Sequence, residues 1–275
     1  MHVDVRELAA RHGVRPSKAL GQNFLLDPNL ARAIARDAGV GPGDHVVEIG
    51  AGFGSLTAAL VDAGAAEILA IEFDRRLVAG LRETVAGHPV VRVLHADATA
   101  LDWAGALGEG PWIACGNLPY NVGTSIVIDL LERAPVTRVV VMLQREVGER
   151  LVASPTGADR GAFGALSLRV AYRASARIVR SVPPEVFWPR PGVGSVVVRL
   201  DRLTAPPVDV DEAALWRVVD TAFAQRRKTM RNAVRRLGVT AEEAEAILAT
   251  AGIDPAARPE ELDLAAYARI VESLG

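Results

Sequence analysis

The sequence predicts an α/β fold, a Rossmann-like domain with a seven-stranded sheet, followed by a small all-α domain. Between residues 46 and 200, short apolar runs typical of buried strands alternate with segments of helical periodicity. A glycine-rich turn, Gly50–Gly54, follows the first of these runs. After a proline-containing break at 204–209, only helical periodicity remains. We therefore expect a first domain over residues 1–203, a linker at 204–209 and a helical domain over 210–275.

The composition is that of an ordinary globular protein, with 275 residues, of which 50% are hydrophobic and 23% charged. No apolar run reaches the roughly 18 residues of a membrane helix, and the first residues lack a signal peptide's basic and apolar regions. We therefore expect a cytoplasmic protein without a membrane segment. Cys115 is the single cysteine, which excludes an internal disulfide, and the five histidines never have zinc-ligand spacing, so no metal site is predicted.

Charge is unevenly distributed along the chain. Residues 1–130 hold 10 Lys and Arg against 15 Asp and Glu, a net charge of −5, whereas residues 133–236 hold 19 against 9, a net charge of +10. The second half is therefore suited to binding a polyanion such as RNA.

The first 28 residues lead into the predicted sheet. Residues 1–16 form a short, helical, arginine-containing arm, and a solvated terminus and an RNA contact both remain open for it. A Gly-Gln-Asn turn at 21–23 precedes the apolar pair Phe24 and Leu25, which could fold over a ligand. The alternative is a simple entry into the helix that begins at Pro28 with Asp27 as its cap.

The first α/β unit predicts a nucleoside-containing ligand. Strand 46–49 is followed by the glycine turn and a helix, and the next strand, 68–71, ends at Glu72. Glycines let the backbone approach a ligand closely, and an acid about 20 residues later can accept hydrogen bonds from ribose hydroxyls. The G-x-G-x-G spacing preceded by Glu48 is typical of S-adenosylmethionine pockets and not of dinucleotide pockets. The first domain is thus expected to be a class I methyltransferase domain.

Two further strands deliver polar residues to the same edge of the sheet. The strand 91–94 leads into Asp97 and Ala98, and Asp97 could accept a hydrogen bond from the adenine amine, although a turn aspartate is the alternative. Strand 112–115 leads into Gly116-Asn117-Leu118-Pro119-Tyr120. There the Asn117 carboxamide oxygen and a backbone carbonyl next to Pro119 could hold an exocyclic amine while Tyr120 stacks on its ring. This is a site for methylating a base, although Asn-x-Pro is also a common turn.

The remaining elements of the first domain alternate as the fold requires. The expected helices are 124–132, 145–152 and 164–172, and the expected strands are 139–143, 176–182 and 195–200. The proline-rich loop before the last strand carries adjacent aromatics, Phe187 and Trp188. We expect Trp188 in the core and Phe187 on the face of a flipped-out base opposite Tyr120.

The second domain is expected to contain four helices, at 212–223, 226–237, 240–250 and 263–274, the third with a Thr240/Glu243 capping box. Arg227, Arg231 and Arg235 recur every four residues, and no acid lies between Arg226 and Arg236 to balance six cations. A basic helical stripe is therefore predicted to bind RNA phosphates. Its members are Arg226, Arg227, Lys228, Arg231 and Arg235.

Taken together, several motifs resemble the ribosomal RNA adenine dimethyltransferases, in particular the bacterial small-subunit enzymes linked to kasugamycin sensitivity. The similar segments are Gly21–Leu25, Val47–Gly52, Gly116–Asn121, Phe187 with Pro189, Pro191, Val193 and Ser195, Gln225–Asn232 and Arg258–Leu262. The resemblance covers about Lys18 to the C-terminus. It implies N6,N6-dimethylation of two adjacent adenosines in the hairpin near the 3′ end of small-subunit rRNA, on an assembling subunit. Nothing in the sequence suggests more than a monomer, and we expect no membrane or metal partner.

The resemblance also implies which residues act. The cofactor S-adenosylmethionine, released as S-adenosylhomocysteine, would be bound by Asn23, Leu25, Gly50, Gly52, Glu72, Asp97, Ala98 and Asn117. The target adenine would be held by Asn117, Pro119, Tyr120 and Phe187. Two positions depart from the family pattern, because Gly192 replaces a lysine and Phe163 replaces a tyrosine. Both departures concern contacts with RNA and not the transfer itself.

Two alternatives remain for the function. The large-subunit rRNA methyltransferases of the macrolide-resistance type share the catalytic domain, but Gly21 before Gln22 and the Gln225–Asn232 segment are closer to the small-subunit type. An RNA-binding assembly factor that keeps the pocket only as a scaffold would bind without transferring methyl groups. The intact Asn117–Tyr120 motif favours catalysis.

Overall fold

The computed structural model describes residues 3–17, 20–119, 121–157 and 160–275. The chain divides into two compact units, one formed by Met1–Gly148 with Ser175–Arg202 and the other by Glu149–Ala174 with Leu203–Gly275. Tyr120, for which we predict a stacking role, lies outside the described residues. We describe each unit by itself.

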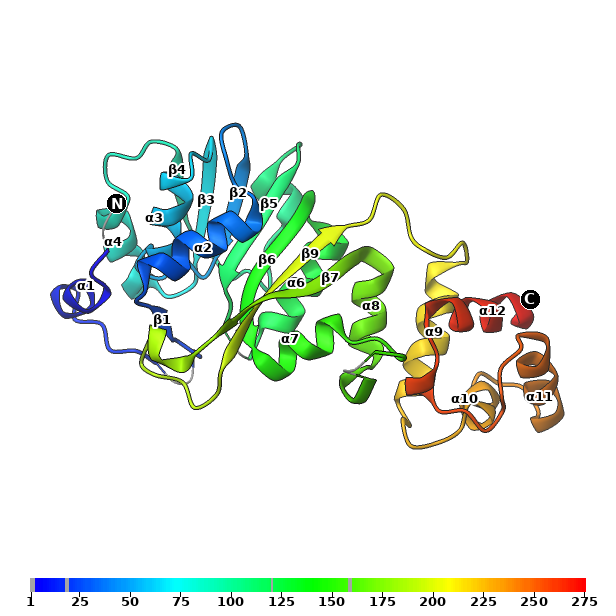
Figure 1. Cartoon of the computed structure of the whole chain (residues 1–275). Helices are drawn as coiled ribbons and strands as arrows, with labels where there is room; N and C mark the ends of the chain where they lie inside the picture. The colour runs from blue at the N-terminus through cyan, green and yellow to red at the C-terminus, as the bar shows by residue number, and fades with distance from the viewer. Residues whose placement is uncertain (1–2, 18–19, 120, 158–159) are drawn as a thin grey trace. The chain divides into compact units, whose positions relative to one another are not determined.

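The first unit is built on a seven-stranded sheet with the order β4-β3-β2-β5-β6-β9-β7 (Figure 1). The strands are β2 His45–Ile49, β3 Glu67–Glu72, β4 Val91–His95, β5 Trp112–Asn117, β6 Val136–Gln144, β7 Ala174–Val182 and β9 Ser195–Arg202. The pairs among β4, β3, β2, β5 and β6 are parallel, and β9 runs antiparallel to β6. The seven predicted strands and the Rossmann-like fold class are thus confirmed.

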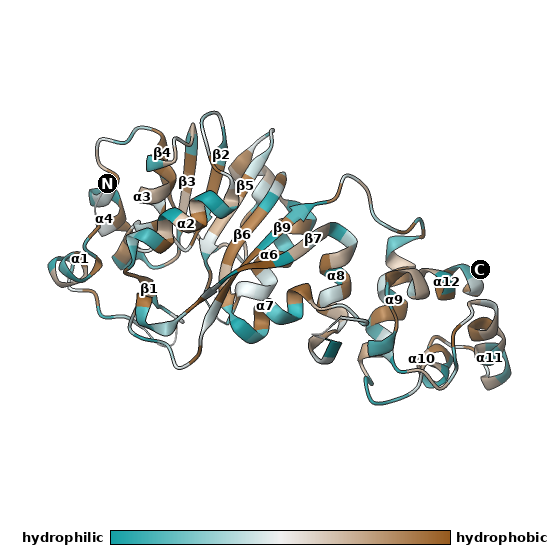
Figure 2. Ribbon diagram, viewed as in Figure 1, coloured by the Kyte–Doolittle hydropathy of each residue, from teal (hydrophilic) through white to brown (hydrophobic). Residues whose placement is uncertain are grey.

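Helices cover this sheet because each presents an apolar stripe to it. They are α2 Pro28–Ala38, α3 Ser55–Asp62, α4 Arg75–Thr84, α5 Trp103–Leu107, α6 Gly123–Arg133 and the first half of α7 Arg145–Val152, which belongs to this unit up to Gly148. α2 and α3 pack against each other, with Ile34 and Leu60 fully buried next to Val46 of β2. Figure 2 shows the apolar residues concentrated on the strands of the sheet. The parallel strands end together at one edge, which fixes where a ligand can bind.

Two short elements lie outside the main sheet. β1, Phe24–Leu25, pairs antiparallel with β8, Phe187–Trp188, so that Leu25 faces Phe187 across the ladder. The N-terminal helix α1, Val5–Arg11, buries Val5, Leu8 and Ala9. The helix Val5–Arg11 is therefore docked on the first unit and is not a solvated segment.

The second unit is helical. It contains α8 Ala165–Arg173, α9 Glu212–Phe223, α10 Met230–Arg235, α11 Ala241–Thr250 and α12 Leu264–Leu274. Phe163, Leu168 and Tyr172 pack in one core with Leu215 and Val218 of α9. Residues 149–174 therefore belong to this unit, although the break in the α/β pattern at 204–209 predicts them in the first domain. Their apolar side chains pack with those of α9 and α12. These segments are far apart in the sequence, so local patterns do not predict the contact.

The helix expected at 226–237 is wrong at its beginning. α10 starts at Met230, and Gln225–Lys228 forms a turn. The physical reason is tertiary, since the Arg226 guanidinium donates to the backbone oxygen of Phe163 (3.2 Å) and the Met230 amide donates to that of Ala257 (2.8 Å). The four-residue spacing of Arg227, Arg231 and Arg235 therefore does not describe one helical stripe.

Candidate active site

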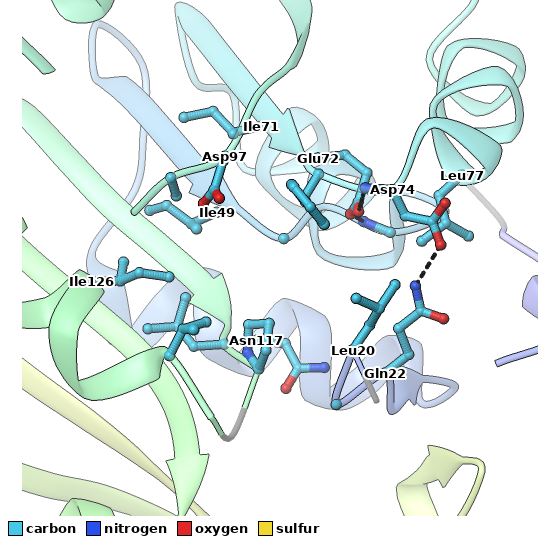
Figure 3. Close-up of a pocket in the computed structure, with 18 of the residues that line it drawn as sticks. Leu20, Gln22, Ile49, Ile71, Glu72, Asp74, Leu77, Asp97, Asn117 and Ile126 are labelled. Atoms are coloured by element: carbon cyan, nitrogen blue, oxygen red, sulfur yellow. Dashed lines mark hydrogen bonds between the residues drawn. The ribbon is translucent and has the colours of Figure 1, made fainter. Parts of the chain in front are cut away.

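A cavity of about 290 Å³ lies at the carboxyl ends of the parallel strands (Figure 3). Its lining comes from several segments far apart in the sequence, namely Leu20–Phe24, Ile49, Gly50, Gly52, Ile71–Asp74, Leu77, Ala96–Thr99, Asn117–Pro119, Asn121, Val122 and Ile126. The position is where open α/β sheets bind ligands, and most of the wall is apolar with a few polar groups between. Most of the predicted site residues thus meet in one place.

The glycine turn forms the floor of this cavity. Gly50 and Gly52 have φ values of 74° and 59°, in the left-handed region that favours glycine. The amides of Gly50 and Ala51 both donate to the Ile71 backbone oxygen, at 2.9 and 3.0 Å, which fixes the turn against β3. A Cβ at Gly50 would lie 3.5 Å from the Asn117 backbone oxygen. Without a side chain at these positions, a ligand in the cavity can approach the backbone closely.

Glu72 stands at the end of β3 with its side chain largely buried. One carboxylate oxygen accepts from the Gly52 amide and the other from the Asp74 amide, both at 2.8 Å. Burial raises the pKa of the Glu72 carboxyl above its ordinary value, against the lowering effect of these hydrogen bonds. Each oxygen keeps a second lone pair, so the group can still accept hydrogen bonds from a ligand in the cavity.

Asp97 and Ala98 form another part of the wall. One Asp97 oxygen accepts from the Thr99 amide (2.8 Å) and hydroxyl (2.7 Å), so the aspartate does cap a turn, as the alternative interpretation proposed. It nevertheless lines the cavity beside the buried Ala98. Phe73, which directly follows Glu72, also lines the cavity with 55% of its surface exposed. This exposed ring offers a flat apolar face to a ligand.

The segment before α2 closes the cavity from another side. The Gln22 carboxamide donates to Asp74 (2.8 Å), and Asn117 Nδ2 donates to the Asn23 backbone oxygen (2.8 Å). Leu25 does not line this cavity, because it is 5% exposed and packs in the core beneath. Its backbone oxygen accepts a hydrogen bond from the Ser55 hydroxyl (2.8 Å).

Asn117 is the last residue of β5, and its side chain reaches the cavity rim (Figure 3). Donation from its Nδ2 to the Asn23 backbone oxygen fixes the orientation of the carboxamide, and the carboxamide oxygen is the atom that can accept a hydrogen bond from a ligand. Gly116 allows this strand to close on β2, since a Cβ there would lie 2.6 Å from the Ile49 backbone oxygen. Leu118 and Pro119 continue the wall beyond Asn117. The arrangement is an acceptor at an apolar rim, suited to an amine on an aromatic ring.

Phe187 is not brought to the cavity. Its side chain is 3% exposed and packs in the core of the first unit, in the same cluster as Leu25, its partner in the β1–β8 ladder. Trp188, expected in the core, is half-buried and lies 6.1 Å from Phe24 between ring centroids. Phe187 is therefore the buried ring and Trp188 the partly exposed one, the opposite of the expectation. The antiparallel pairing with β1 determines which of the two rings points into the core.

Several cavity residues have no motif that sequence reasoning could use. Phe73, Leu77, Val122 and Ile126 are apolar side chains that line the wall. The one available signal is position, since Phe73 lies between an acidic strand end and Asp74, the N-cap of α4. Periodicity alone would place all four in the core.

Glu48, the acid before the glycine turn, is buried behind it on β2. It is 2% exposed and accepts a hydrogen bond from the Thr57 hydroxyl. Burial raises the pKa of Glu48 to about 8, and the neighbouring Glu72 charge adds to this. The carboxyl is therefore mostly neutral around pH 7, which avoids a buried charge.

The raised pKa of Glu48 predicts a pH dependence of stability. The folded state retains a proton that the unfolded state releases above about pH 4.5. The free energy of unfolding therefore falls as pH rises from about 4.5 to 8. Glu48→Gln keeps the hydrogen bond from Thr57 without the titration. We expect its melting temperature to exceed that of the wild type by roughly 5 °C at pH 8, a difference of about 2 kcal/mol, and to match it at pH 5. Melting temperatures of both proteins, measured by thermal unfolding from pH 5 to pH 8, check this prediction. The same pH dependence of the melting temperature in both proteins would contradict it.

Basic side chains of the second unit divide into two groups. Arg226 lies 3.6 Å from Glu260 and Arg231 lies 2.7 Å from Glu245. Arg227, Lys228 and Arg235 have no acidic partner among residues 3–17, 20–119, 121–157 and 160–275. The latter two border a hollow of about 400 Å³, whose lining is Gln225, Lys228, Asn232, Arg235, Arg236 and Val239.

Within the part of the chain that the structure describes, no helix is long and apolar enough to cross a membrane. The same residues contain no cluster of three or more His, Cys, Asp or Glu side chains that could hold a metal ion.

Comparison with known proteins gives a consistent result. The profile of the ribosomal RNA adenine dimethylase family matches residues 14–275, so that α1 lies before the matched segment. A protein named ribosomal RNA small subunit methyltransferase A from Acidothermus cellulolyticus is 44% identical over 276 residues, covering 98% of this chain and 93% of the relative. Its namesake from Moorella thermoacetica is 45% identical over 278 residues, covering 97% and 95%.

Solved structures resemble this fold over most of its length. The crystal structure of the 23S rRNA methyltransferase ErmE matches with a TM-score of 0.70 and 28% identity, covering 92% of this chain and 99% of that one. A dimethyladenosine transferase from Plasmodium falciparum matches with a TM-score of 0.77, covering 90% and 95%. At 20% identity, the second likeness shows the fold alone.

Proposed function

The chain belongs to the ribosomal RNA adenine dimethylase family, and we propose that it transfers methyl groups from S-adenosylmethionine to N6 of two adjacent adenosines in the 3′-terminal hairpin of small-subunit (16S) rRNA. The observation that carries this proposal is the Asn117 side chain. Its nitrogen donates to the Asn23 backbone oxygen, and its oxygen can accept a hydrogen bond at the rim of a cavity at the carboxyl edge of the sheet.

The cavity's lining fits the proposed cofactor. Glu72 would accept hydrogen bonds from the ribose hydroxyls, and Asp97 from the adenine amine beside Ala98, with Phe73 against the ring. Asn23, Gly50 and Gly52 would lie near the methionine part, where backbone atoms are accessible. Leu25 would act only through its backbone, since its side chain is buried below.

The cofactor supplies a methyl group already activated on a sulfonium, so this chain's task is to align it with the adenine nitrogen. The N6 lone pair is delocalised into the ring, and a hydrogen bond from the amine to Asn117 Oδ1 would favour the pyramidal nitrogen that attacks. This nitrogen would take the methyl group from the cofactor held by the residues named above, with S-adenosylhomocysteine as the product. The methylated nitrogen is then acidic and loses its proton to water, so no His or carboxylate is needed. The second transfer repeats these steps on the same nitrogen.

Stacking on the target base is proposed for Tyr120, because it directly follows Pro119 in the sequence and Pro119 lines the cavity. Phe187 is buried in the structure, and its role as the second face stays a prediction.

Binding of rRNA is proposed for Arg227, Lys228 and Arg235, the predicted cations without an acidic partner in the described part of the chain. Arg226 and Arg231 already face Glu260 and Glu245, so each has less charge to offer a phosphate.

For these cations, we predict that Arg235→Ala lowers affinity for small-subunit rRNA by about three- to tenfold and reduces the slope of log affinity against log salt by about one. Arg217→Ala, an exposed arginine of α9, removes the same charge from the same unit and should change affinity by less than about twofold. Filter binding across a salt series makes the comparison. Equal losses in both variants would mean that net charge, and not the hollow, attracts RNA.

The choice of subunit rests on sequence similarity, since the small-subunit relatives are 44–45% identical and ErmE is 28% identical. The proposed partner is therefore the small ribosomal subunit, met in the cytoplasm by a monomer. The test is labelled methyl transfer to small subunits that lack adenine dimethylation, with large subunits and mature small subunits as controls. Label on large subunits would assign the protein to the resistance type, and cofactor binding without any label would favour an assembly factor.

A further inference from the structure

The N-terminal helix α1 forms a small apolar cluster of its own with residues of the cofactor cavity. Asp4 caps the helix, accepting from the Arg6 and Glu7 amides at 3.1 and 3.0 Å. The buried face of α1 packs on Phe24, Phe53 and Leu77. The helix is thus docked through side chains, which the arginine content of this segment does not predict.

Two of the three partners of α1 line the cavity, and the third lies in the glycine turn next to it. Phe24 and Leu77 line the cavity directly. Phe53 belongs to the glycine turn and follows Gly52, whose amide donates to Glu72. One side of this cluster is therefore α1, and the other side is the proposed cofactor site.

The end of α1 lies beside α4 (Figure 1), and charged side chains join the two. Glu83 of α4 pairs with Arg11, and its other oxygen lies 2.8 Å from His12 Nε2. These contacts hold the pKa of the Glu83 carboxyl below its ordinary value. The next residue, Thr84, donates its hydroxyl to the Phe53 backbone oxygen at 2.8 Å. The face of α4 that holds α1 therefore also holds the glycine turn.

The packing at this junction is close. A Cβ at Gly80 of α4 would lie 2.7 Å from the Phe53 ring and 3.2 Å from His12 Cδ2. Phe24 and Phe53 are 5.3 Å apart between centroids. A shift of α1 would therefore be transmitted to both rings.

We propose that α1 is a positioning element of the cofactor cavity, docked by Leu8 and by the contacts of Arg11 and His12 with Glu83, which keeps Phe24, Phe53 and Leu77 in the positions that cofactor binding needs. This proposal rests on the proposed function of the cavity. Molecules in which α1 is undocked bind the cofactor poorly, so the measured dissociation constant rises as the docked fraction falls.

The first test uses a matched pair of core leucines. Leu8 of α1 and Leu264 of α12 are each 8% exposed, but only Leu8 belongs to the cluster behind the cavity. Leu8→Ala should raise the dissociation constant for S-adenosylhomocysteine about tenfold by calorimetry, the change expected when about a tenth of molecules keep α1 docked. Leu264→Ala should leave it within about twofold, because its packing defect lies in the other unit.

The second test avoids the core and uses a matched pair of surface acids. The side chains of Glu83 and Glu67 are 40% and 39% exposed, and each contacts a histidine. Glu83 lies 2.8 Å from His12, and Glu67 lies 3.4 Å from His45. Glu83→Gln should raise the dissociation constant about threefold and raise KM for the cofactor, with kcat at saturating cofactor unchanged. Glu67→Gln should alter neither quantity.

The outcomes separate this proposal from the proposed function. If the wild type binds no S-adenosylhomocysteine, the assignment of the cavity is wrong. If the wild type binds it and Leu8→Ala and Glu83→Gln bind equally well, only the role of α1 is overturned. A fall in kcat with unchanged KM would also overturn it, because that pattern places the effect in the transfer step.

Discussion

Asn117→Ala is expected to lower kcat for methyl transfer about 10²- to 10³-fold, the scale on which removal of one preorganised polar group from an active site acts. The reason is the position of its carboxamide. Donation from its nitrogen to the Asn23 backbone oxygen at 2.8 Å fixes the orientation of the carboxamide, whose oxygen can hold the adenine amine as charge develops on it. Single-turnover transfer from labelled S-adenosylmethionine measures the chemical step.

The control for this variant is Asn29→Ala, at the exposed start of α2, which removes a carboxamide remote from the cavity and should leave kcat unchanged. Binding of S-adenosylhomocysteine to Asn117→Ala should persist within a few-fold, roughly 1 kcal/mol, since most cofactor contacts remain. Full transfer activity in a variant that still binds cofactor would remove Asn117 from the mechanism.

Glu72→Ala is expected to weaken cofactor binding by about 10²-fold or more. The variant removes both oxygens proposed to accept ribose hydroxyls, and hydrogen bonds to a charged group are worth about 1.5–3 kcal/mol each. It also leaves the Gly52 and Asp74 amides without their acceptor, which loosens the glycine turn. Calorimetry with S-adenosylhomocysteine gives the affinity directly.

The same strand offers the control for Glu72. Glu67 begins β3 and Glu72 ends it, so Glu67→Ala removes a carboxylate from the opposite edge of the sheet. We expect Glu67→Ala to bind cofactor as the wild type does. If Glu72→Ala also retained wild-type affinity, the ribose would have to bind elsewhere.

Local patterns predict most of the fold because the central strands β2, β3, β4 and β5 contain short apolar runs that end at glycine or a polar residue. Helix α9 begins and ends where its periodicity predicts, at Glu212 and Phe223. The Thr240/Glu243 capping box forms in both directions, at 3.2 and 2.7 Å. Gly50, Glu72 and Asn117 meet at one edge because parallel strands end together.

The remaining features depend on contacts between distant segments. The turn at 225–228 depends on carbonyls of the Gly161–Phe163 segment, more than 60 residues earlier, which no local periodicity encodes. The burial of Phe187 over Trp188 depends on pairing with Leu25. The docked helix α1 depends on Glu83. In each case a tertiary partner overrides the local preference.

The most direct test of the account is the identity of the modified nucleoside. Small subunits that lack adenine dimethylation are incubated with the protein and S-adenosylmethionine, and the digested rRNA is analysed by mass spectrometry and by mapping of the modified positions. The account predicts N6,N6-dimethyladenosine at two adjacent positions of the 3′-terminal hairpin, and its loss in Asn117→Ala. Methylation of another atom, such as a ribose oxygen or a ring carbon, would contradict the role given to Asn117.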